Sequence, residues 1–326
     1  MKVLIAGGAG YVGTNLSNYL ANVGYDITVV DHFWFGDYLS RSVNKQHRSI
    51  MSLTPRDLKG FDAVVFLGGL SNDPMANFDP LGNFIENGAA PSYLAYISKK
   101  AGVRRFIFAS SCSVYGFTDG VEMDETVQVS PQYPYGISKV QAEVAIMLLE
   151  DDSFKPICLR KGTIGGWSER MRFDLVINAM TKTALKEGKI TVNNPNIWRP
   201  LLEIRDAVSA YEAAIISDPM ISGIFNLSYG NYQVIDIGNG VQRELQDRGH
   251  NVQLEVNNIY DVRNYKVSNE KFISTFNFVP THDPLSSVGE ILDHVTTSEF
   301  DFDDERWYNI QTFMKLKNNR RGPSHE

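Results

Sequence analysis

A tyrosine and a lysine stand four positions apart in the segment Tyr135-Gly136-Ile137-Ser138-Lys139. Pro134 fits the first position of a helix and apolar residues continue the pattern to 149, so both side chains should face one side of a helix. A free tyrosine, with a pKa of about 10, is a poor base at neutral pH. A lysine one turn away favours the phenolate and lowers that pKa. The spacing therefore predicts a tyrosine that removes a proton from an alcohol, with Lys139 assisting.

Serines gather directly after the apolar run 106–109, in Ser110-Ser111-Cys112-Ser113. Ligands of α/β sheets bind beyond the carboxyl ends of parallel strands. A small hydroxyl group at such an end can bind a substrate alcohol without filling the cleft. Ser111 is the strongest catalytic candidate and Ser113 a substrate-binding candidate, although Ser110 and Ser113 also suit an ordinary turn at the end of a strand.

A glycine-rich turn follows the first apolar run, in Gly7-Gly8-Ala9-Gly10-Tyr11-Val12-Gly13. Gly7 suits a tight turn, Gly10 lets backbone N–H groups approach a diphosphate, and Gly13 lets a helix pack close to the strand. Asp31 ends the second apolar run, where a carboxylate accepts ribose hydroxyls and repels a 2′-phosphate. The pattern predicts bound NAD rather than NADP, although His32 and Arg41 lie nearby. The predicted cofactor site comprises Gly7, Gly10, Tyr11, Val12, Gly13, Asp31, Ile50, Leu67, Asn87, Tyr135 and Lys139.

The elements that must position these residues alternate along the chain. Apolar runs at 3–6, 27–30, 63–67, 106–109 and 156–159 alternate with helical patterns such as 11–23 and 91–100. We expect an α/β fold, a Rossmann-type doubly wound parallel sheet with a smaller, discontinuous C-terminal substrate lobe. The cofactor domain should comprise 1–165 and 200–230, and the substrate lobe 166–199 and 231–315, followed by a flexible tail at 316–326. Further predictions are helices at 174–187, 206–217 and 234–249, and strands at 223–227 and 253–256.

Composition excludes several classes of protein. The 326 residues include 31 Lys and Arg and 38 Asp and Glu, a net charge of -7 that argues against nucleic-acid binding. No apolar run reaches the roughly 18 residues of a membrane helix. The only cysteines, Cys112 and Cys158, indicate a reducing compartment without disulfides, so we expect a cytoplasmic protein. No metal site is predicted.

In order and spacing, the glycine loop, Asp31, Ser111 with Val114-Tyr115-Gly116, and Tyr135 with Lys139 resemble the extended short-chain dehydrogenase/reductases. The resemblance is to their NAD-dependent nucleotide-sugar epimerases and dehydratases, of the UDP-galactose 4-epimerase type, and extends to about Pro284. It implies that Tyr135 is the base, that Lys139 holds the nicotinamide ribose and that Ser111 binds the sugar oxygen. It places Asn87 in the cofactor cleft. Its implied substrate-binding residues are Ser71, Ser111, Ser113, Thr163, Asp174, Arg199 and Arg263, of which the two arginines could otherwise form surface salt bridges.

Departures from the family pattern narrow the reaction. The 4,6-dehydratases carry Asp-Glu after the catalytic Ser or Thr, where this chain has Cys112 and Ser113, so dehydration is disfavoured. The 3,5-epimerase/reductases carry a cysteine two residues after the serine, whereas Cys112 directly follows Ser111. A shift of one residue on a strand turns the side chain to the opposite face, so we expect Cys112 to be packed rather than catalytic. The resemblance therefore implies a 4-epimerase of a nucleotide-diphosphate sugar. A net 4-dehydrogenase or 4-keto reductase remains the alternative. A non-catalytic dinucleotide sensor is disfavoured, because such a protein would be free to lose Tyr135, which this chain keeps. The resemblance also implies a role in polysaccharide biosynthesis, and a homodimer joined through helices 79–100 and 135–150.

Overall fold

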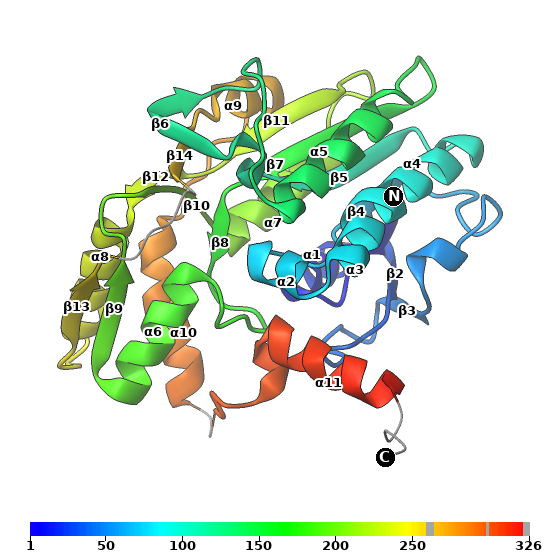
Figure 1. The fold of residues 1–326 in the computed structure, drawn as a ribbon. Coiled ribbons are helices and arrows are strands. Elements are labelled where there is room, and N and C mark those ends of the chain that lie inside the picture. The colour runs from blue at the N-terminus through cyan, green and yellow to red at the C-terminus, as the bar shows by residue number, and fades with distance from the viewer. Residues whose placement is uncertain (259–263, 298–299, 322–326) are drawn as a thin grey trace.

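A parallel sheet forms the centre of the molecule. The computed structural model describes residues 1–258, 264–297 and 300–321. The strands of this sheet are β1 (Lys2–Ala6), β2 (Asp26–Asp31), β3 (Asn44–His47), β4 (Ala63–Phe66), β5 (Arg105–Ser111), β7 (Lys155–Lys161) and β11 (Gly223–Leu227). Their order is β11-β7-β5-β4-β1-β2-β3, with every neighbouring pair parallel (Figure 1). This is the predicted Rossmann-type sheet, and it contains all the predicted apolar strands.

Helices cover both faces of the sheet because successive strand residues point to opposite sides. Val3 and Ile5 belong to the core beneath α1 (Tyr11–Asn22) and α7 (Ile204–Ile216). Leu4 and Ala6 belong to the core beneath α4 (Ala90–Lys100) and α5 (Pro134–Met147). Figure 1 shows α4 and α5 running side by side. The sheet is thus buried on both faces, as its continuous apolar strands predict.

The segment predicted as one helix over 79–100 is helical from residue 80 onward, but its type changes along its length. It contains α3 (Pro80–Phe84), the π-helical turn η2 (Ile85–Ala89) and then α4, and α2 (Asp73–Phe78) precedes it. Asp79 separates α2 from α3, since its Oδ1 accepts a hydrogen bond of 3.0 Å from the backbone N–H of Gly82. A helical backbone therefore runs from Pro80 to Lys100, as predicted, and the Asp79 side chain caps its start.

A second hydrophobic cluster lies beside the sheet. It is built on α6 (Val176–Glu187), α8 (Val234–Gln246) and α10 (Ser287–Thr296), with Ile177, Ile237 and Val288 in its core. Three small sheets accompany it: β6 (Phe117–Met123) with β14 (Asn264–Val267), β9 (Lys189–Asn193) with β13 (Gln253–Asn257), and β10 (Trp198–Glu203) between β8 (Thr163–Gly165) and β12 (Gly230–Gln233). The short 3₁₀ turns are η1 (Ile50–Ser52), η3 (Cys112–Tyr115), η4 (Pro284–Ser286) and η5 (Glu305–Trp307).

Residues from the last third of the chain return to the main sheet. Phe272 of α9 (Glu270–Phe276) lies edge-on to Phe225 of β11, and buried Trp307 belongs to the same core. The final helix, α11 (Asn309–Arg321), passes the predicted start of a flexible tail at 316 without a break. Residues 322–326 lie outside the described part of the chain. Within the described residues, no helix is both long and apolar enough to cross a membrane.

A buried ion pair ties α5 to β7 behind the serine cluster. Arg160 donates from Nη2 to Glu143 at 2.7 Å, and the two side chains are 5% and 2% exposed. Arg160 also donates to the hydroxyl oxygen of Tyr115 at 2.9 Å, and that hydroxyl donates to Asn226 Oδ1 at 2.8 Å. Removing one partner of such a buried ion pair lowers the free energy of unfolding by more than the intact pair contributes, because the remaining charge is left buried and unpaired.

Replacing Arg160 should therefore destabilise the fold. In Arg160→Met the Glu143 carboxylate is left buried without its cation, and the free energy of unfolding should fall by about 3–5 kcal/mol. Urea unfolding followed by circular dichroism measures the loss. The control is Lys189→Met, because Lys189 and Glu255 form an exposed pair and its removal should cost less than about 1 kcal/mol. Equal losses in the two variants would contradict the prediction.

Candidate active site

A cleft opens at the carboxyl ends of β1, β2, β4 and β5. It gathers fourteen of the predicted site residues: Gly7, Gly10, Tyr11, Val12, Gly13, Asp31, Ile50, Leu67, Ser71, Ser111, Ser113, Tyr135, Thr163 and Arg199. Among the described residues, Lys139, Asn87 and Asp174 do not line it. Arg263 lies outside the described residues. The cleft therefore joins the glycine loop to the serine cluster and to the tyrosine.

The glycine loop brings three pieces of backbone close together. Gly7 has φ +80°, and a Cβ atom there would lie 2.3 Å from the backbone nitrogen of Gly68. A Cβ at Gly13 would lie 2.5 Å from the carbonyl oxygen of Gly7. Gly10 is the N-cap of α1 and has no side chain to occupy the first N–H groups of that helix. This helix end fits the diphosphate of a dinucleotide.

Asp31 is fixed at the end of β2 by two backbone N–H groups. Its Oδ2 accepts from Ala9 at 2.9 Å and its Oδ1 from Phe33 at 2.9 Å. Each carboxylate oxygen keeps a further lone pair for a hydroxyl group. Asp31 therefore links the glycine loop to the strand end where a ribose would be held, as predicted.

Tyr135 lies in the first turn of α5, at the edge of the cleft. The Ser111 side chain hydrogen-bonds to it, and Ser113 Oγ donates to Ser111 Oγ at 3.0 Å. Burial raises the pKa of Tyr135 well above its usual value, and the Asp73 carboxylate raises it further, whereas Arg172 and the Ser111 hydrogen bond lower it. The predicted lowering of this pKa is therefore not observed, because burial outweighs the nearby positive charge.

Lys139 lies on the same helix face as Tyr135 but is covered. Its Nζ donates to the carbonyl oxygen of Ala109 at 3.0 Å and lies 5.6 Å from the centre of the Tyr135 ring. Burial, followed by the positive charge of Lys161, lowers the pKa of Lys139 to about 7. The tyrosine–lysine pair predicted from the sequence is therefore present, with its ammonium group held by the end of β5.

The other members of the serine cluster point inward. Ser110 is fully buried and donates to Glu143, so it belongs to the buried ion-pair network. Cys112 is 1% exposed, and its Sγ donates to the carbonyl oxygen of Arg160 at 3.1 Å. Burial raises the pKa of the Cys112 thiol. The prediction that Cys112 is packed rather than catalytic is confirmed.

Two predicted residues support the walls without lining the cleft. Asn87 is buried in η2, where its amide donates to Leu70 at 2.8 Å and to Asn83 at 2.7 Å. Asp174 accepts both Nε and Nη2 of Arg172, at 2.9 and 2.7 Å. The predicted helix at 174–187 begins two residues later, at Val176, after Leu175 in extended conformation.

Sequence reasoning missed five charged residues that line the cleft: Asp73, Glu86, Lys161, Arg170 and Arg172. Arg172 also donates to Ser71 Oγ at 2.9 Å, which places it on the same wall as a predicted substrate residue. The available signal was the alternation in Arg170-Met171-Arg172-Phe173, which in an extended segment puts both arginines on one side.

Two curated relatives were compared with the chain. It is 29% identical to UDP-glucose 4-epimerase of Rhizobium leguminosarum bv. trifolii over 191 residues, which is 51% of this chain and 56% of that protein. It is 26% identical to UDP-glucose 4-epimerase of Lactobacillus helveticus over 269 residues, 72% of this chain and 80% of the relative. The chain thus spans only about half the length of the first of these relatives.

Solved structures share the fold. The NAD-dependent NDP-hexosamine 5,6-dehydratase TunA matches with a TM-score of 0.81 at 21% identity, covering 93% of this chain and 99% of that one. UDP-glucose 4-epimerase of Thermus thermophilus, solved with NAD, matches with a TM-score of 0.79 at 20% identity, covering 91% of this chain and 100% of that one.

A family model covers the main sheet from its first strand to its last, together with the segment between β7 and β11. Residues 3–227 match the model described as the NAD dependent epimerase/dehydratase family, so the match runs from β1 to the end of β11. The cleft geometry agrees with this match, since the glycine loop, Asp31 and the tyrosine–lysine pair all lie within those residues. The chain belongs to the NAD dependent epimerase/dehydratase family, and its cofactor is NAD.

Proposed function

We propose that this protein is a 4-epimerase of a nucleotide-diphosphate sugar. The observation that carries the proposal is the contact between Ser111 and the Tyr135 phenol at the edge of the dinucleotide cleft, with a buried thiol and a hydroxyl at positions 112 and 113. These groups suit the removal and return of one proton at a carbinol. The two 4-epimerase relatives support the same reaction.

In this mechanism the protein holds one sugar hydroxyl between two oxygens. Ser111 binds the hydroxyl oxygen, Tyr135 removes its proton, and Lys139 keeps a positive charge at the ribose side of the tyrosine. Gly7, Gly10, Gly13 and Asp31 would hold NAD, whose nicotinamide would supply the reversible hydride transfer at C4. Tyr135 then gives its proton back, so the protein ends each cycle in its starting state.

Residues of the second cluster and of the cleft wall are proposed to hold the nucleotide diphosphate. Arg199 lines the cleft from β10, with its guanidinium carbon 5.7 Å from the centre of the Tyr265 ring. A planar guanidinium binds phosphate oxygens in bidentate fashion. We therefore propose Arg199, Thr163 and Ser71 as substrate contacts and residues 166–199 and 231–315 as the principal substrate lobe, although α9 packs on the main sheet.

One observation favours dehydration as a second candidate reaction. The cleft contains the carboxyl groups of Asp73 and Glu86, so an acid is available even though none follows Ser111 directly. Asp73 lines the same cleft as Tyr135, and its charge raises the pKa of the Tyr135 phenol. Dehydration removes water from the sugar, whereas epimerisation leaves its mass unchanged.

A panel of UDP-, GDP-, CDP- and dTDP-sugars distinguishes the reactions. Reduced cofactor is read by absorbance at the same time as the products are identified by chromatography and mass spectrometry. A 4-epimer of equal mass without accumulated NADH supports the proposal. Stoichiometric NADH indicates a net dehydrogenase, a product lighter by one water indicates a dehydratase, and either would overturn it.

Tyr135→Phe should abolish turnover, because a phenyl ring cannot exchange the proton. The loss should be at least about 100-fold, as for other positioned acid–base groups. Affinity for NAD, measured by calorimetry, should change little. Tyr133→Phe is the matched control, because Tyr133 is the adjacent N-cap residue and does not line the cleft. Retained turnover in Tyr135→Phe would remove Tyr135 as the base.

Asp31→Ala should narrow the preference for NAD over NADP. Removing the carboxylate removes its hydrogen bonds to ribose hydroxyls and its repulsion of a 2′-phosphate. The measurement is the ratio of the two dissociation constants. Asp37→Ala serves as the control, since Asp37 pairs with Lys45 outside the cleft. An unchanged ratio in Asp31→Ala would show that discrimination lies elsewhere.

We also propose a homodimer formed through α3, η2, α4 and α5. This face carries exposed apolar residues that a second copy could cover: Leu81, Phe84, Ile85, Tyr96, Ile137, Val144 and Leu148. Leu81 and Leu148 are 71% and 81% exposed, which is unfavourable in water. The free, buried thiols of Cys112 and Cys158 support placement in the cytoplasm, where nucleotide sugars could supply polysaccharide biosynthesis.

Light scattering should give a mass twice the 36.6 kDa of the chain. The double variant Val144→Glu with Leu148→Glu should shift the protein to monomer, because a dimer would bury these charges. Val256→Glu, on an exposed strand remote from α5, should leave the dimer intact. A monomeric unsubstituted protein would contradict the proposal.

A further inference from the structure

The segment after β8 crosses the start of α1, where the cofactor diphosphate would lie. Tyr11 donates from its hydroxyl to the carbonyl oxygen of Gly166 at 2.7 Å, and Ser168 donates to the carbonyl oxygen of Tyr11 at 2.9 Å. Asn15 holds the next carbonyl, that of Trp167, at 2.9 Å. The segment is thus fixed against the helix end, and it carries Arg170 to the wall of the cleft.

Arg170 is a buried cation without a carboxylate partner in the described part of the chain. It is 1% exposed, and its guanidinium carbon lies 3.7 Å from the centre of the Phe35 ring. Nη1 donates to the carbonyl oxygen of Met171 at 3.2 Å, Nη2 donates to the side chain of Asn309, and Nε makes no hydrogen bond. Burial lowers the pKa of Arg170 to about 9, and the positive charge of Arg172 lowers it further, whereas the more distant carboxylates of Asp174 and Asp31 offset this only in part.

Other buried arginines of this protein are compensated in different ways. Arg160 and Arg172 each pair with a carboxylate, Glu143 and Asp174. Arg105 is 4% exposed and also lacks a carboxylate among the described residues, but it donates to four backbone carbonyl oxygens, those of Lys155, Ser217, Asp218 and Ile221. Arg170 has neither a paired carboxylate nor a set of backbone carbonyl partners like that of Arg105. Among these four arginines, it alone lacks both and also lines the cleft.

We propose that Arg170 is a phosphate-binding residue for the cofactor, held against the diphosphate by Phe35 and by Asn309 of α11. A diphosphate carries the negative charge that the buried guanidinium lacks, and its oxygens match the planar donors of arginine. The N-terminus of α1 would approach the same phosphates from the glycine loop. This inference rests on the cofactor site and not on the identity of the sugar.

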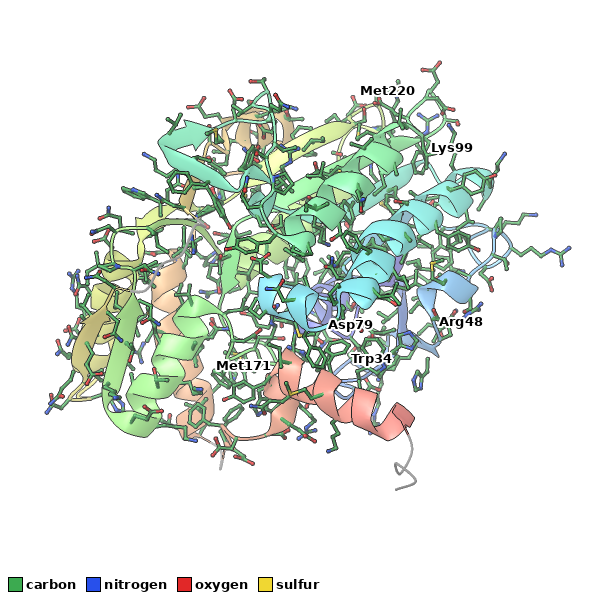
Figure 2. All side chains as sticks on the ribbon, viewed as in Figure 1. Trp34, Arg48, Asp79, Lys99, Met171 and Met220 are labelled. Carbon is green, nitrogen blue, oxygen red and sulfur yellow. The ribbon has the colours of Figure 1, made fainter. Side chains whose placement is uncertain are left out.

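The proposal makes α11 part of the cofactor site. The ring of Phe313 in α11 lies edge-on to those of Trp34 and Phe35, with ring centres 4.9 and 5.9 Å apart. The Asn309 amide donates to Ser71 Oγ at 3.0 Å. Figure 2 shows Trp34 beside α11 and Met171 close to its first turn. The helix thus joins the strand end that carries Asp31 to the wall that carries Arg170, and positions the guanidinium from outside the family-matched residues.

Binding of cofactor fragments to the full-length protein tests the role of Arg170. In Arg170→Met, the dissociation constants of ADP and NAD should rise about 10- to 100-fold, because a charge-assisted hydrogen bond is lost. The dissociation constant of adenosine, which has no phosphate, should change less than about twofold. Calorimetry or NMR titration of the cofactor-stripped protein gives these values without any turnover.

Arg105→Met is the matched control, since it removes a buried arginine remote from the cleft. It should lower the melting temperature and leave the affinities for ADP and adenosine unchanged. Arg170→Lys keeps the charge but loses the planar fork, so it should retain folding and lose ADP affinity selectively, to a smaller extent.

Three outcomes would overturn the proposal. Equal losses of ADP and adenosine affinity would assign Arg170 a structural role. Unchanged ADP affinity would exclude contact with the diphosphate. A loss confined to NADP would place the guanidinium at the ribose 2′ position. None of these readouts depends on epimerisation, so a failure of the proposed reaction would leave this test intact.

Discussion

The close approach of three backbone segments at Gly7, Gly13 and Gly68 sets the geometry on which the rest of the site depends. A side chain at Gly7 would collide with the loop after β4, and one at Gly13 would collide with the turn itself. Either would push α1 away from β1. The helix end, the carboxylate at the tip of β2 and the wall after β8 are all placed relative to this contact. The cleft therefore depends on the lack of side chains at these glycines as much as on the side chains that line it.

Burial also governs the chemistry of the tyrosine–lysine pair. It makes the phenol of Tyr135 harder to ionise and the ammonium group of Lys139 easier to deprotonate. Arg172 and Asp73 act on the Tyr135 phenol in opposite directions from the same cleft. In the proposed mechanism, the positive charge of the bound cofactor would favour the ionised phenol that removes the proton.

Local patterns predicted the parts of this protein that local physics determines. The buried strands, the glycine turn, Asp31 and the Tyr135 helix each follow from apolar periodicity or from turn chemistry. The exposed edge strand β3, Asn-Lys-Gln-His, has no apolar signal because it is buried on neither face. The polar helix α11 and the partners of Arg170 depend on contacts between residues more than a hundred positions apart, which no local pattern records.

The return of β11 to the sheet has a consequence for dividing or making this chain. β7 ends at Lys161, and the strand that pairs with its outer edge begins only at Gly223, after the chain has crossed the second cluster. A fragment cut near residue 165 would lack β11, so the backbone N–H and C=O groups on that side of β7 would be unpaired. β7 would then be an exposed edge strand that can aggregate with other chains. During synthesis the same edge stays unpaired until some sixty further residues have been made, an interval in which it can pair with other chains.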